Sequence, residues 1–164
     1  MSQLDYSLDQ AVGFEGQLAD LQLKNVESHV AEGEVFIGKM VTQGTALGQV
    51  LHPTTAGGVT DEKLVKGLVI HSHTQESKYP NGSGNYSYLD KAAIPVLTKG
   101  RAWVKPEDVI TAATSTVNCR YAGVGTKGAL RGAAVGAETA VMPKAKWKTS
   151  TTAIGQLAQI ELSL

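Results

Sequence analysis

The stretch that most constrains this chain is residues 94–105, in which two kinds of side chain alternate along the sequence. Successive side chains of a strand point to opposite faces, so a period of two residues separates one face from the other. One set is Val96, Thr98, Gly100, Ala102 and Val104, and the other is Leu97, Lys99, Arg101, Trp103 and Lys105. Pro106 carries no backbone N–H and ends the pattern. The sequence therefore predicts a long strand over residues 94–105.

Shorter strand patterns recur along the chain, and no stretch shows a long helical period. Strands are predicted within residues 34–42, 49–52, 64–72, 141–149 and 156–162, with a loop over residues 54–60. Val, Ile and Thr number 37 against 18 Leu plus Met, and β-branched side chains favour pleated surfaces over helices. We therefore expect an all-β fold: a compact, mostly antiparallel β-sandwich or barrel, jelly-roll-like, with an extended N-terminal arm.

The length of 164 residues suits one domain. Residues 1–27 show no clean period and are predicted to be the N-terminal arm, whereas residues 28–164 are predicted to be a single β domain. An arm of this kind buries too little to order alone but can lie along a neighbouring molecule. Its scattered apolar residues are therefore expected to contact a partner: Phe14, Leu18, Leu21 and Leu23.

Residues 74–90 form the clearest loop, with Pro80, Asn81-Gly82 and Gly84-Asn85 in succession. It is long for a plain connector, and long loops often carry binding residues. Two of its aromatic side chains, the closely spaced Tyr86 and Tyr88, are therefore predicted to be further partner contacts.

The charge balance and the single cysteine exclude several classes of protein. Fifteen basic and fifteen acidic residues cancel, which disfavours a protein whose main task is to grip nucleic acid. Cys119 has no second cysteine to pair with, so no intrachain disulfide forms. No signal-peptide pattern opens the sequence, and no apolar run approaches the ~20 residues of a membrane span. We expect synthesis in a reducing cytoplasm and no direct contact with nucleic acid or membrane.

Three arrangements of residues resemble cofactor-binding, metal-binding or catalytic motifs, but other interpretations of each are favoured. Gly123-x-Gly125-x-x-Gly128 matches a dinucleotide fingerprint, but Gly132 and Gly136 interrupt the helix that must follow, so a flexible turn is the better interpretation. His71-x-His73 has a spacing that suits zinc but lacks an identifiable third ligand.

Cys119 beside a histidine would make a nucleophilic dyad, whereas a buried structural thiol is the more usual arrangement. We therefore predict no enzyme activity, no cofactor and no metal. A small ligand-binding β-barrel or enzyme that uses the 74–90 loop with His71 and His73 stays open as an alternative.

Two groups of basic residues are predicted to lie on strand faces. They are Lys144, Lys146 and Lys148, and Lys99, Arg101 and Lys105. Such a group either contacts an anionic surface or is a solvated face whose lysines keep an edge strand from aggregating. The second interpretation is favoured over direct contact with nucleic acid, and contact with a protein stays open.

The order of several segments resembles the structural cement, or capsid decoration, proteins of tailed bacteriophages. The resembling segments are Gly16-Gln17-Leu18-Ala19-Asp20, Val26-Glu27-Ser28, Ala31-Glu32-Gly33, Gly38-Lys39-Met40-Val41, Gly67-Leu68-Val69-Ile70-His71-Ser72-His73, Ile94-Pro95-Val96-Leu97-Thr98-Lys99-Gly100-Arg101-Ala102-Trp103-Val104, Ala145-Lys146-Trp147-Lys148-Thr149-Ser150 and Glu161-Leu162. None is a chemical motif, so the resemblance depends on their order and spacing. One departure is Lys105-Pro106-Glu107-Asp108, where such proteins often have a Gly-Asp-Pro turn.

The resemblance implies a non-catalytic protein of the virion that binds the outer capsid surface. It would stabilise the mature head by bridging capsomers of the major capsid protein, as a dimer or trimer. Simultaneous contacts to several subunits make such a bridge strong even where each contact is modest. A phage tail or baseplate component built on a similar β domain is the other alternative.

Overall fold

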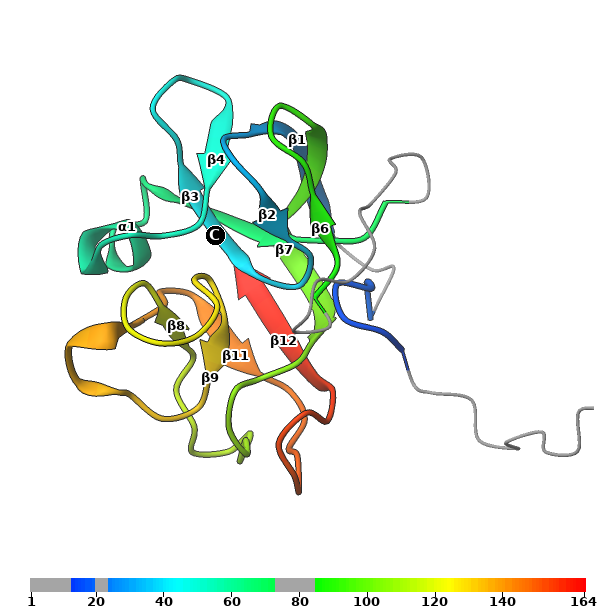
Figure 1. Cartoon of the computed structure of the whole chain (residues 1–164). Coiled ribbons are helices and arrows are strands. Elements are labelled where there is room, and N and C mark those ends of the chain that lie inside the picture. The colour runs from blue at the N-terminus through cyan, green and yellow to red at the C-terminus, as the bar shows by residue number, and fades with distance from the viewer. Residues whose placement is uncertain (1–12, 20–23, 73–84) are drawn as a thin grey trace, which may run out of the picture.

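The computed structural model describes residues 13–19, 24–72 and 85–164, which form strands of differing length, one α-helix and one 3₁₀ turn (Figure 1). The elements are β1 (Asn25–Ala31), β2 (Val35–Phe36), β3 (Met40–Gln43), β4 (Gln49–Leu51), α1 (Ala56–Thr60), β5 (Val65–Val69), β6 (Ser87–Tyr88), β7 (Ala93–Val104), β8 (Asn118–Arg120), β9 (Leu130–Arg131), η1 (Gly136–Glu138), β10 (Thr139–Val141), β11 (Ala145–Trp147) and β12 (Ala158–Ser163). The all-β prediction is confirmed.

Five strands close a barrel. They follow the order β1-β4-β3-β5-β7, and β1 pairs back onto β7 to complete the circle. Among the described strand pairings only β1 with β4 is parallel, and the others are antiparallel as expected. Beyond the barrel, β12 and β11 extend the same sheet from the second half of β7.

The long strand β7 serves both parts of the sheet. Its first half pairs with β1 and β5 in the barrel, and its second half pairs with β12. Gly100 lies where the two halves meet, at a φ of 128° that side chains other than glycine rarely adopt. The register with β1 shifts close to this point, between Asn25 and Val26. This irregularity lets one strand bend from the barrel into the extension.

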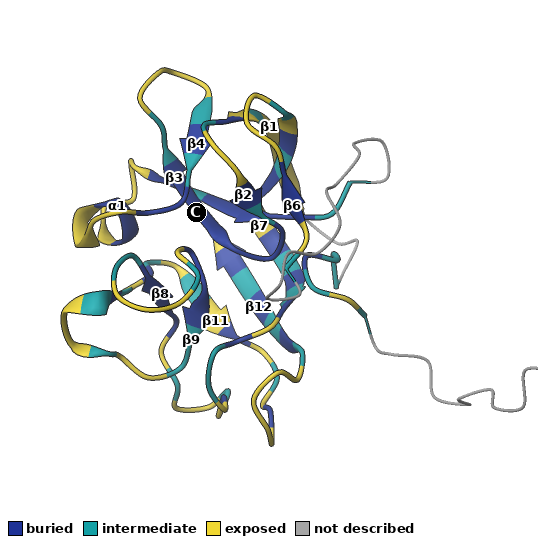
Figure 2. Cartoon of the chain, viewed as in Figure 1, coloured by how far each residue is buried: buried dark blue, intermediate teal, exposed yellow. Residues whose placement is uncertain are grey.

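Several barrel strands are buried on both faces. Val41, Val69 and Val96 face the barrel interior, whereas their chain neighbours Met40, Leu68 and Leu97 face a second, larger core outside it. The larger core is covered by β8, β9, β11, β12 and α1 (Figure 2). Burial on both faces explains why Leu68, Val69 and Ile70 follow one another as an apolar run and do not alternate with polar residues.

The strand structure expected within residues 34–42 is present but divided, and one other local expectation was wrong. Residues 34–42 contain two strands, β2 and most of β3, because the chain turns at Gly38 with a φ of 75°. Residues 54–60, expected to be a loop, contain helix α1, whose N-cap Thr55 accepts a hydrogen bond from the N–H of Gly58 at 3.2 Å. An N-cap of this kind starts a helical turn in spite of the glycines that follow it.

The N-terminal segment, residues 13–19, lies along the free edge of the second half of β7. The N–H groups of Gly16 and Ala19 donate to the carbonyls of Trp103 and Arg101 at 2.7 and 2.9 Å. Strand β1 begins at Asn25, inside the range expected for the arm, because residues 25–27 pair with β7 as well. Residues 1–12 lie outside the described residues, so the division into an arm and a domain stays a prediction.

Candidate functional site

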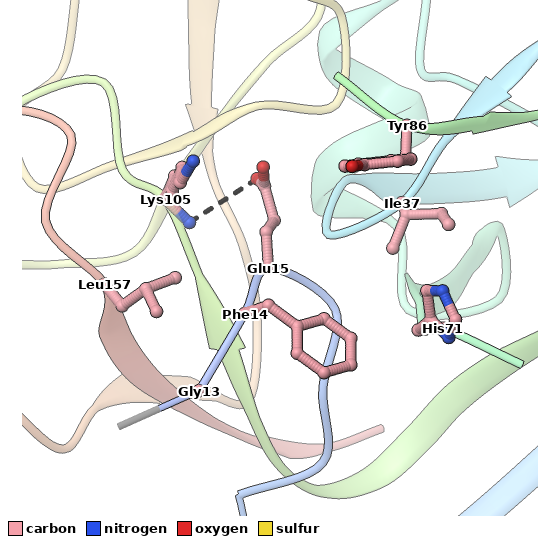
Figure 3. Close-up of a pocket in the computed structure, with 8 residues that line it drawn as sticks. All are labelled: Gly13, Phe14, Glu15, Ile37, His71, Tyr86, Lys105 and Leu157. Atoms are coloured by element: carbon pink, nitrogen blue, oxygen red, sulfur yellow. Dashed lines mark hydrogen bonds between the residues drawn. The ribbon is translucent and has the colours of Figure 1, made fainter. Parts of the chain in front are cut away.

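A pocket opens where the N-terminal segment crosses the end of the barrel (Figure 3). Its volume is about 360 Å³. It is lined by Gly13, Phe14, Glu15, Ile37, His71, Tyr86, Lys105 and Leu157. These residues come from the N-terminal segment, the turn between β2 and β3, the end of β5, the residues before β6, and the ends of β7 and β12. Only the tertiary fold brings them together.

Gly16 fixes the N-terminal segment against two strands at once. Its N–H donates to the carbonyl of Trp103, and its carbonyl accepts from the N–H of His71 at 2.9 Å. Gly16 has a φ of 81°, and an added Cβ would lie 2.2 Å from Cγ2 of Ile37. Glycine is therefore required here both for the backbone conformation and for the close approach.

A buried ion pair holds the same segment from the other side. The Lys39 ammonium donates to the Glu15 carboxylate at 2.5 Å, and the two side chains are 6% and 14% exposed. Glu15 also accepts from the backbone N–H of Lys105 at 3.4 Å. Gly38 allows the approach, because an added Cβ would lie 2.2 Å from Cγ of Glu15. The segment is thus anchored by charge as well as by strand hydrogen bonds.

The pocket wall is largely apolar and aromatic. The rings of Phe14 and His71 meet edge to face, 5.2 Å apart at 83°. The N–H of Ile37 donates to the carbonyl of Tyr86 at 2.9 Å, which brings these two side chains to the same wall (Figure 3). Phe14 is 46% exposed and Tyr86 is 50% exposed. A pocket of this size and lining can accept an apolar side chain of another protein.

The six residues expected to contact a partner differ in their position and burial in the structure. It brings Phe14 and Tyr86 together at the pocket, although they were predicted from separate segments. Leu18 is half-buried against the larger core and forms an isolated antiparallel β-bridge with Ala102. Leu21 and Leu23 lie outside the described residues.

Tyr88 is not at the surface, and its assignment as a partner contact was wrong. Its side chain fills the barrel interior with no exposed area. Its hydroxyl accepts from the N–H of Ser72 at 2.8 Å and donates to the carbonyl of Ile70 at 3.2 Å. A tyrosine in a loop-like sequence can be buried when the fold satisfies its hydroxyl, which sequence alone does not show.

Comparison with known proteins decides the family. A family model described as "Structural cement protein (E217 gp24/Pam3 gp6)" matches residues 2–163. The chain belongs to this phage structural cement protein family. Its role is therefore structural: it stabilises the phage capsid and belongs to the virion. Among curated proteins no match is found.

A solved structure shows the same fold as this cement protein. It is a chain of the capsid of Myoviridae phage XM1, with a TM-score of 0.68 at 14% sequence identity. The alignment covers 96% of this chain and 94% of that chain. The likeness therefore extends over the whole barrel and its extension.

In this cement protein, the residues considered for catalysis or for binding a cofactor lie in surroundings typical of residues that only support the fold. Burial raises the pKa of the Cys119 thiol, and a protonated thiol is a poor nucleophile. The glycines 123, 125 and 128 lie in the turn between β8 and β9, as the turn interpretation predicted. His73 lies outside the described residues, and within the described part of the chain no group of three or more His, Cys, Asp or Glu side chains could hold a metal ion.

The basic groups of the cement protein are partly neutralised. Lys144 pairs with Glu62 at 2.6 Å, and Arg101 pairs with Glu161 at 2.8 Å. Lys148 lies 3.4 Å from the same Glu161. None of the described helices is long and apolar enough to cross a membrane.

Sequence reasoning missed two apolar walls of the pocket, Ile37 and Leu157. Ile37 was placed inside a predicted strand, and Leu157 was placed in a terminal strand that begins only at Ala158. The signal that was available is Gly38, since a glycine inside an apolar run marks a turn or a close approach.

Proposed function

We propose that this protein binds the outer surface of the shell formed by the major capsid protein and bridges neighbouring capsomers. It acts there as a dimer or trimer, without catalysis and without contact to nucleic acid. Family membership supports capsid stabilisation, and the observation that carries the binding proposal is the pocket beside Phe14 and Tyr86. Two half-exposed aromatic rings on a rigid wall are suited to anchoring a protein contact.

The rigidity of this wall favours tight binding. The segment that carries Phe14 is already ordered by the Glu15–Lys39 ion pair and by its hydrogen bonds to β7. A contact surface that is ordered before binding loses less conformational entropy when the complex forms. An apolar side chain of the shell protein would enter the pocket between the rings of Phe14 and Tyr86.

The test uses undecorated capsids of the same phage. Full-length protein and the variants Phe14→Ser and Tyr86→Ser are titrated onto the capsids, and bound copies are counted. We expect each variant to bind about tenfold more weakly, because an aromatic anchor is lost. Leu89→Ser is the matched control, since Leu89 is 57% exposed but does not line the pocket. Equal curves for all four proteins would show that the pocket is not the contact.

Purified virions separate the capsid assignment from a tail or baseplate role. Copies of a capsid cement protein scale with those of the major capsid protein, whereas a tail component is present in far fewer copies. A quantitative gel of virion proteins measures this ratio directly. If the ratio corresponds to only a few copies of this protein per particle, the proposal is rejected.

A further inference from the structure

The same five-residue pattern occurs twice in the chain. Residues 45–49 read Thr-Ala-Leu-Gly-Gln, and residues 152–156 read Thr-Ala-Ile-Gly-Gln. The first copy connects β3 to β4, and the second connects β11 to β12. Both connections join antiparallel neighbours, so both copies occupy hairpin tips.

The two copies also fold in the same way. The N–H of Gln49 donates to the carbonyl of Ala46 at 3.1 Å, and that of Gln156 donates to Ala153 at 3.5 Å. The glycines at the third position of these turns, Gly48 and Gly155, have φ values of 81° and 87°. A turn with positive φ at its third residue requires glycine there. The shared sequence therefore specifies a shared turn.

Each turn is held by hydrogen bonds to its threonine. The N–H and hydroxyl of Thr45 donate to the two carboxylate oxygens of Glu32 at 2.6 and 2.5 Å. The hydroxyl bond is the main cause that lowers the pKa of Glu32. The N–H and hydroxyl of Thr152 donate to Oε1 of Gln156 at 2.8 and 3.1 Å. Glu32 in one turn and Gln156 in the other thus fix the threonine by the same pair of hydrogen bonds. Both hairpin tips are therefore ordered before a partner binds.

Each ordered turn presents one aliphatic side chain to solvent. Leu47 is 99% exposed and Ile154 is 71% exposed. A single exposed aliphatic residue is ordinary, but two in the same position of the same clamped turn are not scattered residues. Figure 1 shows the β3–β4 tip at the top of the molecule and the β11–β12 connection at the bottom, and Figure 2 shows exposed residues at both.

We infer that Leu47 and Ile154 are matched apolar contacts that insert into equivalent apolar sockets on two copies of the shell protein. The inference rests on the proposed capsid binding and names the residues that make the bridge. Two alike contacts at opposite ends fit a partner that repeats around the molecule, as subunits of a shell do. Leu and Ile differ only in the branching of one aliphatic chain, so one kind of socket accepts both.

The experiment measures binding to undecorated capsids by full-length protein and by Leu47→Ser, Ile154→Ser and the double variant. We expect each single variant to bind about tenfold more weakly, equal to about 1.4 kcal/mol, and the double variant about a hundredfold more weakly, because distant sites add. Isolated capsomers give a second readout: the wild type links them, and the double variant is expected to link them far more weakly. Thermal unfolding is expected to stay unchanged, since both side chains lie in solvent.

Three control variants make the result specific. Leu47→Ile and Ile154→Leu keep an aliphatic tip and are expected to bind normally. Val124→Ser removes a side chain that is 94% exposed but lies outside the repeated turn, and it is also expected to bind normally. Loss of binding in Val124→Ser equal to that in the tip variants would show a general effect of surface apolarity and overturn the inference.

The outcomes separate this inference from the proposed function. If the wild type does not bind capsids, capsid binding itself is wrong, and the inference falls with it. If the wild type binds and the tip variants bind equally well, the proposed function stands and the inference is overturned. If the double variant changes the oligomeric state of the protein without capsids, the tips contact another copy of this chain, which also overturns it.

Discussion

The barrel interior is packed almost entirely with hydrocarbon, whereas the three-stranded sheet β10-β8-β9, here the outer sheet, depends on charged side chains. The interior side chains are Ala31, Val35, Ile37, Val41, Val50, Val69, Tyr88, Ile94 and Val96. Their only polar side-chain group, the Tyr88 hydroxyl, has hydrogen-bond partners. The barrel strands also close on one another, so no free edge is left.

The outer sheet has strands of only two or three residues. Arg120, whose side chain is 6% exposed, pairs with Glu107 at 2.8 Å and with Glu138 at 2.6 Å. Arg131 adds contacts to Glu107 and Asp108 at 3.4 and 3.6 Å. Short strands contribute few ladder bonds, so this network and the core beneath it hold the sheet. Where hydrophobic area is scarce, a fold uses directional polar contacts, and these respond to salt.

The largest loss of stability is expected from a substitution in the larger apolar core, on which the outer sheet packs. Trp147 is 4% exposed in the larger core, and its indole N–H donates to the carbonyl of Thr116 at 3.0 Å. Trp147→Ala is expected to lower the free energy of unfolding by about 3 to 5 kcal/mol. Urea unfolding followed by circular dichroism measures this. A loss below about 1 kcal/mol would mean that the core collapses into the space and that the contrast with the barrel is overstated.

The charged network is tested by Arg120→Ala. The change leaves Glu107 largely buried without its main partner, which we expect to destabilise the protein by about 3 kcal/mol. Ile94→Val in the barrel is the control, with an expected loss of about 1 kcal/mol. Raising the salt concentration should shrink the effect of Arg120→Ala by a small amount, because the Glu138 carboxylate is 40% exposed, and should leave that of Ile94→Val unchanged. Equal salt dependence of the two variants would contradict the comparison.

One buried histidine makes the barrel side sensitive to pH. Burial lowers the pKa of His52 from 6.5 to about 4, and its ring bonds the carbonyl of Met40 and the N–H of Phe36 at 2.9 Å each. The unfolded chain therefore binds a proton at higher pH than the folded one. Stability is full above about pH 6.5 and falls as the pH drops towards 4, by about 2 kcal/mol between pH 7 and pH 5.

His52→Gln is the matched variant for this pH effect. It removes the titrating ring, so its stability should change less between pH 7 and pH 5 than that of the wild type, whatever its stability at pH 7. Denaturant midpoints at the two pH values give both slopes. Identical slopes would assign the pH dependence to other groups.

The smallest effect is expected at the second tryptophan. Trp103 is half-buried, and the N-terminal segment covers part of it, since an added Cβ on Gly13 would lie 2.8 Å from its ring. Trp103→Ala should cost ~1.5 kcal/mol, about half the value of full burial. Melting temperatures of the two tryptophan variants, measured together, give the order. A loss as large as that of Trp147→Ala would show that the N-terminal segment belongs to the core.

The sequence alone predicted those strands and turns that depend on side chains close together along the chain. The alternation of residues 94–105 predicted β7, observed as Ala93–Val104, because strand periodicity depends only on which faces are buried. The excess of β-branched residues and the lack of helical periods predicted an all-β chain. The repeated pentapeptide was also readable in the sequence, because turn chemistry depends on a few adjacent residues.

Tertiary structure decided which distant residues meet. Closure of β1 onto β7, burial of both faces of β3 and β5, and the meeting of Phe14 with Tyr86 all depend on strand pairing between remote segments. Local patterns carry no information on which strands pair, because any two strands of suitable polarity satisfy the same hydrogen bonds. For the same reason Tyr88, read as a loop residue, became part of the barrel core: its place was set by β2, which pairs with it across the fold.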